Sequence, residues 1–256
     1  MKDSVFVPPL TFLNLPYSTD FHNADVAILG IPYDCARDSI RFGSRQGPNA
    51  ARHASVLTGK LLKDAAPCPL DSLHVVDAGN VNLSLEDIGQ AFARIEQAMS
   101  EVLEHRCTPL AVGGDGAVSL PQMRALNKKF GQFAVVHIDA HTDAWPVQPE
   151  TPYTNANQFT HAVNENLVDI EAAMHIGTRG PVNAAAAVES ARNMGYEVIP
   201  FDLYRQWGVP RVLQHIHERF GDKPVFICYD MDFFDPAMVP GVATPTPGGA
   251  LPEEGI

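Results

Sequence analysis

The chain has 256 residues, 45% of them hydrophobic, and a formal net charge of −12. A chain of this length and composition suits one large α/β domain with a sizeable core. The acidic charge disfavours nucleic acid and anionic membranes as partners and favours small cations, although it also serves solubility. The sequence does not begin with a basic segment followed by an apolar one, and it has no run of ~18 apolar residues. It therefore predicts neither an export signal nor a membrane span.

The cysteines indicate a reducing compartment. There are four, and none forms a CxxC pair: Cys35, Cys68, Cys107 and Cys228. Two of them lie in or beside apolar segments. This usage is typical of reduced thiols, so we predict a cytoplasmic protein.

Apolar runs typical of strands alternate with helical patterns along the chain. Residues 1–22 are rich in proline and aromatic residues, and we expect an arm that packs on the single domain 23–256 or on a neighbouring subunit. Strands are expected at 25–30, 73–77, 110–112, 133–139, 173–177, 197–201 and 225–230. Helices are expected at 48–58, from a cap formed by Ser84 with Asp87 to about His105, from Pro121 onward, and at 159–168, 183–194 and 209–220.

This alternation predicts the fold class. Strands that alternate with helices favour a three-layer α/β/α fold, with a mainly parallel sheet covered on both faces. In such sheets, ligands bind at the carboxyl ends of the strands. We therefore look for a site in the residues that follow each strand.

The strand expected at 133–139 ends in residue types that bind metals: Asp139, His141 and Asp143. If the chain is extended there, its period of two puts the three side chains on one side. Carboxylate oxygens with one imidazole form a ligand set suited to Mn²⁺, Zn²⁺, Co²⁺ or Ni²⁺. An isolated aspartate at such a position more often caps a helix, but this alternation favours a metal site.

A second strand, expected at 225–230, also ends in two carboxylates two residues apart, Asp230 and Asp232. Together the two strand ends could supply four carboxylates and one imidazole at one edge of the sheet. That is too much negative charge for one cation. Two divalent ions about 3.5–4 Å apart, which share carboxylates and activate a water between them, would balance it.

Three blocks of sequence resemble the ureohydrolases, a family that comprises arginase, agmatinase, guanidinobutyrase, formimidoylglutamase and proclavaminate amidinohydrolase. Residues 113–116 (GGDG) are similar to the GGDH motif, 139–143 match DAHxD, and 230–241 match DxDxxDPxxxPG. The segments 30–34 and 41–43 look most like the agmatinase branch. The resemblance implies an arginase-like fold.

The resemblance also implies two manganese ions in each subunit, with Ni²⁺ or Co²⁺ as alternatives. It implies that Asp139 and Asp230 bridge the two ions. His141 and Asp232 would complete one site, and Asp143 would belong to the other.

Two further aspartates, Asp115 and Asp235, are expected to support these ligands from outside, Asp235 by orienting its loop. The implied reaction is hydrolysis. A water activated by the two ions attacks a guanidinium carbon, and urea leaves with an amine.

The chain departs from the family pattern at Gly116, where the family has the histidine of GGDH. In the family, that histidine and the aspartate that corresponds to Asp143 bind the same metal ion. The resemblance therefore implies that the metal site of Asp143 loses its only imidazole. We therefore expect a weakened site, and we expect Gly116→His to tighten it.

A second departure follows the DAHxD motif, where the family carries a run like HGTPF. One register puts Asn155 at the position of that histidine, in a substrate-binding role, and leaves His161 on a helix surface. The other register makes His161 the catalytic histidine, acting with Asp143. The family's distal acidic residue would lie beyond Ile256, and Pro252 with two glutamates is typical of a helix start, so we expect a truncated chain.

Two functional hypotheses follow. The first is an amidinohydrolase of the agmatinase or guanidinobutyrase type, which would split agmatine into putrescine and urea. The second is a catalytically impaired relative that serves as a regulatory or structural subunit. The implied partners are a cationic guanidino molecule and further copies of the chain, in a trimer or a hexamer.

Overall fold

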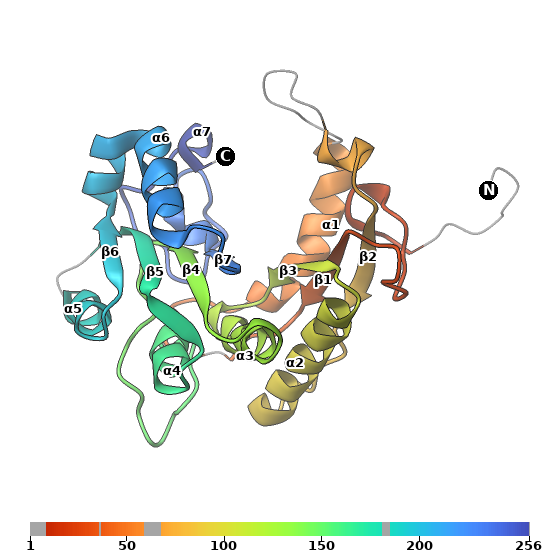
Figure 1. The fold of residues 1–256 in the computed structure, drawn as a ribbon, viewed down its shortest axis with the longest axis horizontal. Helices are drawn as coiled ribbons and strands as arrows, with labels where there is room; N and C mark the ends of the chain where they lie inside the picture. Colours follow the sequence, from red (N-terminus) through yellow and green to blue (C-terminus); the bar gives the residue numbers. More distant parts are fainter. Residues whose placement is uncertain (1–8, 36, 59–67, 181–184, 256) are drawn as a thin grey trace, which may run out of the picture. The chain divides into compact units, whose positions relative to one another are not determined.

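The computed structural model describes residues 9–35, 37–58, 68–180 and 185–255 (Figure 1). The chain divides into two compact units. The first comprises Met1–Tyr33 and Arg45–Gly114, and the second comprises Asp34–Ser44 and Asp115–Ile256. Each unit contains its own hydrogen-bonded sheet, and every strand pairing in both sheets is parallel. The parallel α/β class is therefore confirmed, with the strands in two sheets; the single-domain boundary at residue 23 stays a prediction.

The sheet of the first unit has three strands in the order β2-β1-β3. They are β1 (Val26–Ile31), β2 (Val75–Asn80) and β3 (Thr108–Gly113), and they are followed by or precede helices α1 (Gly47–Thr58) and α2 (Ile88–Glu104). The predicted capping pair of α2 is half right. Asp87 alone is its N-cap, where the side chain accepts a hydrogen bond from the Gln90 amide.

The described part of the predicted arm, residues 9–22, lies against this first unit. Its short helical turn, Phe12–Asn14, is held by hydrogen bonds from the Phe12 amide to Asp77 and from the Leu13 amide to Ser55. Tyr17 forms an isolated parallel bridge with Asp77. The first eight residues of the predicted arm lie outside the described residues.

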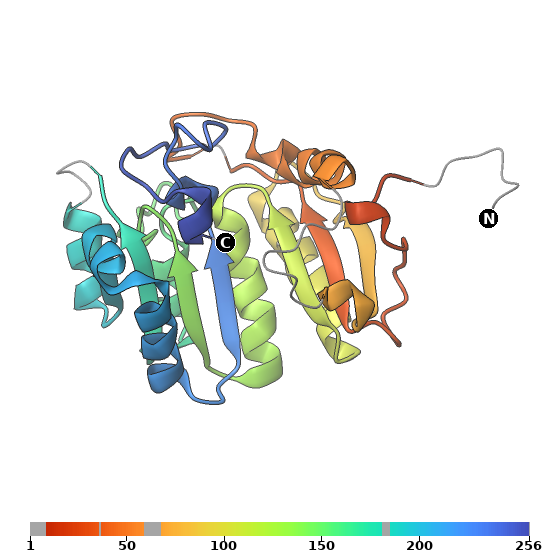
Figure 2. The ribbon, with the colours of Figure 1, turned by 90° about the horizontal axis from the view of Figure 1, so that it is seen from above.

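The sheet of the second unit has four strands in the order β6-β5-β4-β7. They are β4 (Phe133–Ile138), β5 (Val168–Thr178), β6 (Glu197–Pro200) and β7 (Val225–Tyr229). The helices are α3 (Ser119–Phe130), α4 (Gln158–Asn164), α5 (Ala185–Asn193), α6 (Phe201–Phe220) and α7 (Pro252–Gly255). Figure 1 shows α6 on one face of this sheet and α3 and α4 on the other, and Figure 2 shows β4 and β7 side by side. Strand β4 is buried along almost its whole length because both faces are covered.

Two predicted boundaries in this unit are wrong. Strand β5 begins at Val168, not at Ala173, so helix α4 ends earlier, at Asn164. Val168, a β-branched residue at the start of β5, pairs with Phe133 of β4, and this long-range pairing outweighs the local helical pattern.

Element α6 begins at Phe201, and the part of it that precedes the predicted helix at 209–220 was not expected. Gly208 adopts a left-handed conformation (φ 70°) just before Pro210, which has no amide hydrogen to donate. The helical conformation is interrupted at Gly208, so α6 consists of two helical segments joined at a kink, and the predicted helix at 209–220 corresponds to the second. The first turns carry Phe201 and Tyr204 into the core, which a boundary drawn at the kink overlooks.

The core of the second unit is aromatic and aliphatic, and it lies directly beneath the ends of β4 and β7. Its members include Val136, Met174, Ile176, Ile199, Phe201, Phe233 and Phe234. All four cysteines are free thiols, as predicted. Across the described ranges, no helix is both long enough and apolar enough to cross a membrane.

Candidate metal centre

The acidic residues of the two motifs meet at the carboxyl end of the second unit's sheet. Strands β4 and β7 are direct neighbours, with Ile138 opposite Tyr229. The pairing continues past the strand ends, because the Asp230 amide donates to the Ile138 carbonyl over 2.9 Å. The residues after each strand, including Asp139 and Asp232, therefore face a common space.

A first cluster consists of Asp139, His141 and Asp232, whose ligand atoms all lie within 4.8 Å of one another. His141 Nδ1 lies 3.2 Å from Asp139 Oδ1 and 3.1 Å from Asp232 Oδ2. The other ring nitrogen of His141 lies 3.2 Å from the hydroxyl of Thr246. The imidazole is thus held between two carboxylates and a hydroxyl.

A second cluster consists of His137, Asp139 and Asp143, within the same 4.8 Å limit. His137 is fully buried, and its Nε2 approaches Asp139 Oδ2 to 2.9 Å without hydrogen-bond alignment. Its Nδ1 lies 2.8 Å from Nδ1 of His175, so one of these two nitrogens carries the shared proton. The sequence interpretation missed His137, although the period of two that aligns Asp139 with His141 also includes it.

Three of the other predicted residues lie outside both clusters. Asp230 accepts a hydrogen bond from the Asp232 amide over 2.8 Å. Asp115 accepts from the amides of Cys35 and Ala117. Asp235 accepts from the backbone amides of residues 237, 248 and 249, and so ties the two ends of this loop together.

The two candidates for the missing loop histidine lie in different surroundings. Asn155 lies beside Gly116, and its Oδ1 is buried without a hydrogen-bond partner among the described residues. His161 instead points to the Pro152 carbonyl, 2.7 Å from its Nε2, and to Glu165. The structure therefore brings Asn155 toward the site and leaves His161 in contacts of its own helix and loop.

Arg179, at the end of β5, is a second residue that the sequence interpretation missed. One guanidinium nitrogen, Nη2, donates to the carbonyl oxygens of Asp232 (2.6 Å) and Thr246 (2.7 Å). These are the two segments that contact His141 from opposite ends. Arg179 therefore positions both of them, which no local pattern around it indicates.

Crowded charges shift the pKa values in this site. Burial opposes the protonation of His141, but hydrogen bonds and charges of Asp139 and Asp232 outweigh it and raise its pKa to about 11. Burial and the Asp139 charge raise the pKa of Asp232 to about 6 and raise that of Asp143 as well. Burial with the charges of Asp232 and Asp139 raises the pKa of Asp230.

These residues fit a divalent metal. The two clusters share Asp139 and combine carboxylate oxygens with imidazole nitrogens, a donor set that first-row divalent ions accept. Buried polar atoms without hydrogen-bond partners in the described ranges include His137 Nε2, Asn155 Oδ1 and Gln158 Oε1. A cation would satisfy such orphaned atoms and would balance the carboxylates.

Metal binding should release protons, and the affinity for Mn²⁺ should rise between pH 6 and pH 8. At neutral pH, chelator-treated protein carries a proton on His141, whose pKa is about 11, and a metal ligand must give that proton up. Linkage predicts a rise of about tenfold in affinity per pH unit for each proton released. The same raised pKa stabilises the metal-free fold below pH 6.5, and this contribution is lost as the pH rises toward 11.

Calorimetric titration of Mn²⁺ at pH 6, 7 and 8, in buffers with different ionisation enthalpies, measures the released protons directly. An affinity that does not change over this range would contradict the prediction.

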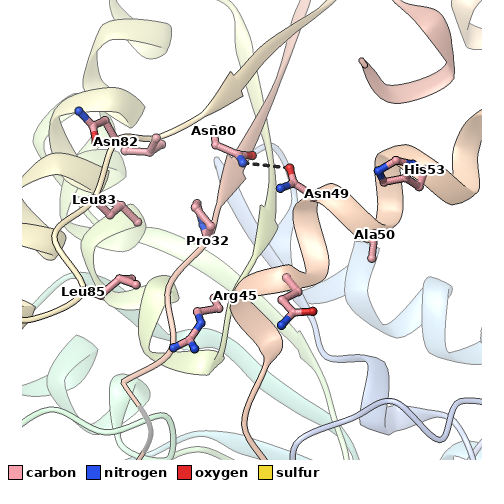
Figure 3. A pocket seen from close by; sticks show the side chains of 11 residues that line it. Pro32, Arg45, Asn49, Ala50, His53, Asn80, Asn82, Leu83 and Leu85 are labelled. Atoms are coloured by element: carbon pink, nitrogen blue, oxygen red, sulfur yellow. Dashed lines mark hydrogen bonds between the residues drawn. The ribbon is translucent and has the colours of Figure 1, made fainter. Parts of the chain in front are cut away.

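The first unit has a hollow of its own, with a volume of about 800 Å³ (Figure 3). It lies at the carboxyl ends of β1 and β2 and beside the start of α1. Asn49 and Asn80 on its wall are joined by a hydrogen bond of 3.0 Å. The remaining lining is Pro32, Arg45, Gln46, Ala50, His53, Val81, Asn82, Leu83 and Leu85. Within the described residues this lining has no carboxylate, so it offers no negatively charged partner for a guanidinium.

Fold and site together define a parallel α/β protein with a candidate centre for two divalent metals at its strand ends. Comparison with known proteins agrees with this class. The model of the arginase family matches residues 24–256. The chain belongs to the arginase family, which is a family of amidinohydrolases.

Several relatives show how similar the chain is to members of this family. It is 35% identical over 244 residues to proclavaminate amidinohydrolase of Streptomyces clavuligerus, covering 95% of this chain and 78% of that protein. It is 35% identical over 253 residues to agmatinase of Photorhabdus laumondii, covering 97% and 76%. The solved structure of the Streptomyces enzyme matches with a TM-score of 0.89 at 34% identity, over 97% of this chain and 82% of that one.

Proposed function

We propose that this chain is a metal-dependent amidinohydrolase that releases urea from a guanidino compound, with agmatine as the first candidate substrate and guanidinobutyrate as the second. The observation that supports it most is that Asp139 is common to the two clusters, because a shared carboxylate is what a pair of nearby ions requires. Relatives named agmatinase and guanidinobutyrase, at 35% and 32% identity, support the choice of substrates.

The proposed metal ligands are Asp139, His141, Asp143, Asp230 and Asp232, with Asp115 and Asp235 as supporting residues. Mn²⁺ is the proposed metal, with Ni²⁺ and Co²⁺ as alternatives. A pair of such ions supplies Lewis acidity and lowers the pKa of bound water, so that hydrolysis can proceed near neutral pH.

The side chains themselves would bind substrate and hold protons. The carboxylates attract a cationic guanidinium, which a net charge of −12 also favours over the whole surface. Asp143 is also the proposed catalytic carboxylate; burial and the Asp139 charge raise its pKa in the metal-free protein, and binding a metal ion requires its ionised form. Thr246 and Arg179 keep His141 and the Asp232 segment in place. Asn155 is the proposed contact to substrate, and His161 as a catalytic group stays a prediction.

The test is urea release by the purified chain, supplied with Mn²⁺ or Ni²⁺, from agmatine, guanidinobutyrate, arginine and free guanidine. We expect urea from agmatine or guanidinobutyrate and none after removal of metal by chelation. If the metal-loaded chain releases urea from none of the four compounds, the proposed activity is wrong.

The second candidate, an impaired relative that acts as a regulatory or structural subunit, is favoured by one observation. The position of the motif histidine is Gly116, and the space beside it is occupied by Gln158 and Asn155. Metal binding without urea release, in a trimer or hexamer measured by light scattering, would support this candidate. The oligomeric state and the cytoplasmic location both stay predictions.

A further inference from the structure

Gly116 has no room for the side chain that the family motif carries there. A Cβ atom at this position would lie 2.7 Å from the backbone oxygen of Asn155 and 2.7 Å from Gln158 Nε2. Both distances are shorter than Cβ contacts in proteins. An imidazole at this position therefore excludes Gln158 from its place, and Gln158 in its place excludes the imidazole.

Gln158 occupies the space that the glycine leaves, and it contacts the same metal ligand. It is the first residue of α4 and is 1% exposed. Its Nε2 donates to Asp143 Oδ2 over 2.6 Å, and that same carboxylate oxygen lies 3.1 Å from the position of a Cβ at Gly116. The amide thus takes the place of the imidazole next to Asp143.

The other amide atom of Gln158 has no hydrogen-bond partner. Oε1 is buried, and none of the described residues donates to it. A buried carbonyl oxygen left unpaired is unfavourable, and a cation beside Asp143 would satisfy it. A half-turn of the amide group exchanges Nε2 and Oε1 of Gln158. It would bring Oε1 next to Asp143 Oδ2 when a cation is present to bind these two oxygens.

We propose that Gln158 supplies the metal ligand that Gly116 cannot, with its amide oxygen binding the divalent ion held by Asp143. This inference rests on the metal centre of the proposed function. It implies that the substitution of glycine for histidine is compensated by a residue on another helix. An oxygen in place of a nitrogen makes the ligand set harder, which favours Mn²⁺ over softer ions such as Zn²⁺ at this site.

The expectation that Gly116→His tightens the second site is corrected by this geometry. The new side chain would push Gln158 away from Asp143 and would press on the backbone at Asn155, which cannot yield as a flexible side chain does. The single substitution should therefore weaken the site. It can be relieved only in part by shortening the glutamine as well, as in Gly116→His with Gln158→Ala.

The test compares Mn²⁺ binding by the unmodified chain, Gln158→Met and Gln158→Glu. Methionine keeps the length of the side chain and removes the amide oxygen, whereas glutamate keeps an oxygen at the same position. Gln122→Met is the matched control, because Gln122 is also buried but donates to the carbonyl of Val118, the residue that precedes α3. Calorimetric titration and the metal content after gel filtration are measured, and both are independent of catalysis.

We expect two ions per chain in the unmodified protein, in Gln158→Glu and in the control. In Gln158→Met we expect one ion to bind as before and the second to bind at least ~10–100-fold more weakly, which is the scale for loss of a supporting residue. The retained first ion shows that the variant is folded.

Two tight ions in Gln158→Met would overturn the inference and leave the proposed function intact. A single ion in both the unmodified chain and Gln158→Met would also overturn it and would favour the impaired relative. An unmodified chain that binds no Mn²⁺ would overturn the proposed function itself.

Discussion

Replacement of Asp139 by asparagine is expected to abolish binding of both metal ions and, with it, urea release. Asp139 is the residue common to the two clusters, and it is 1% exposed. Burial alone would raise its pKa, but the neighbouring His137 and His141 outweigh burial and lower it, so the carboxylate is charged at neutral pH. Asparagine keeps the shape and removes that charge from both sites. The affinity for Mn²⁺ should fall by more than the ~10–100-fold that loss of a supporting residue costs.

Metal content by mass spectrometry and calorimetric titration measure this effect. Asp169→Asn is the matched control, because Asp169 lies on strand β5 of the same unit and pairs with Lys223 at the surface. The control should bind metal as the unmodified chain does. Equal metal binding by Asp139→Asn would show that the two clusters do not hold the ions.

The second large effect is expected on stability, at the buried ion pair of Arg52 and Asp77 in the first unit. Two guanidinium nitrogens, Nε and Nη2, each lie 2.8 Å from a different oxygen of Asp77. Side-chain exposure is 6% for the arginine and zero for the aspartate. Arg52→Met would leave a buried carboxylate without its charged partner. Such a break costs roughly 3–5 kcal/mol of unfolding free energy.

The partner variant separates the loss of charge balance from the loss of packing. Arg52→Met with Asp77→Asn removes both charges, and we expect it to recover much of the lost stability, since a buried pair replaced as a whole is often nearly neutral. Arg94→Met, at an exposed position of α2, is the control. Urea unfolding followed by circular dichroism measures all three. A loss below about 1 kcal/mol in the single variant would match a surface pair and contradict the prediction.

The same ion pair gives a pH dependence. Burial alone would raise the pKa of Asp77, but the hydrogen bonds from Arg52 and from the Phe12 and Gly79 amides outweigh it and lower the pKa below 3.8. Because the pKa is lower in the folded state, the charged carboxylate stabilises the fold at a pH above 3.8, the unfolded pKa. This stabilisation is lost as the pH falls through the folded pKa. The ion pair therefore contributes fully at neutral pH and fails in acid.

Local information in the sequence determined the fold class and predicted most of the residues proposed for the site. The apolar runs define the strands because a strand buried on both faces needs an unbroken apolar segment. Parallel strands bring their carboxyl ends to one edge, and the motif residues that follow β4 and β7 lie there. These rules need no knowledge of distant contacts, and the family motifs reinforce them. The expected alignment of Asp139, His141 and Asp143 by a period of two does not extend beyond β4, which ends at Ile138, and His141 and Asp143 lie in different clusters that share Asp139.

Tertiary structure decided what depends on residues far apart in the chain. The start of β5 follows from its pairing with β4, and the start of α6 follows from aromatic residues that reach the core across a kink. The exchange between Gly116 and Gln158 is invisible in either segment alone, because it arises only when a loop and a helix 42 positions apart share one space beside Asp143. Steric exclusion in a close-packed interior, and not local propensity, determines whether the side chain of residue 116 or that of residue 158 occupies that space.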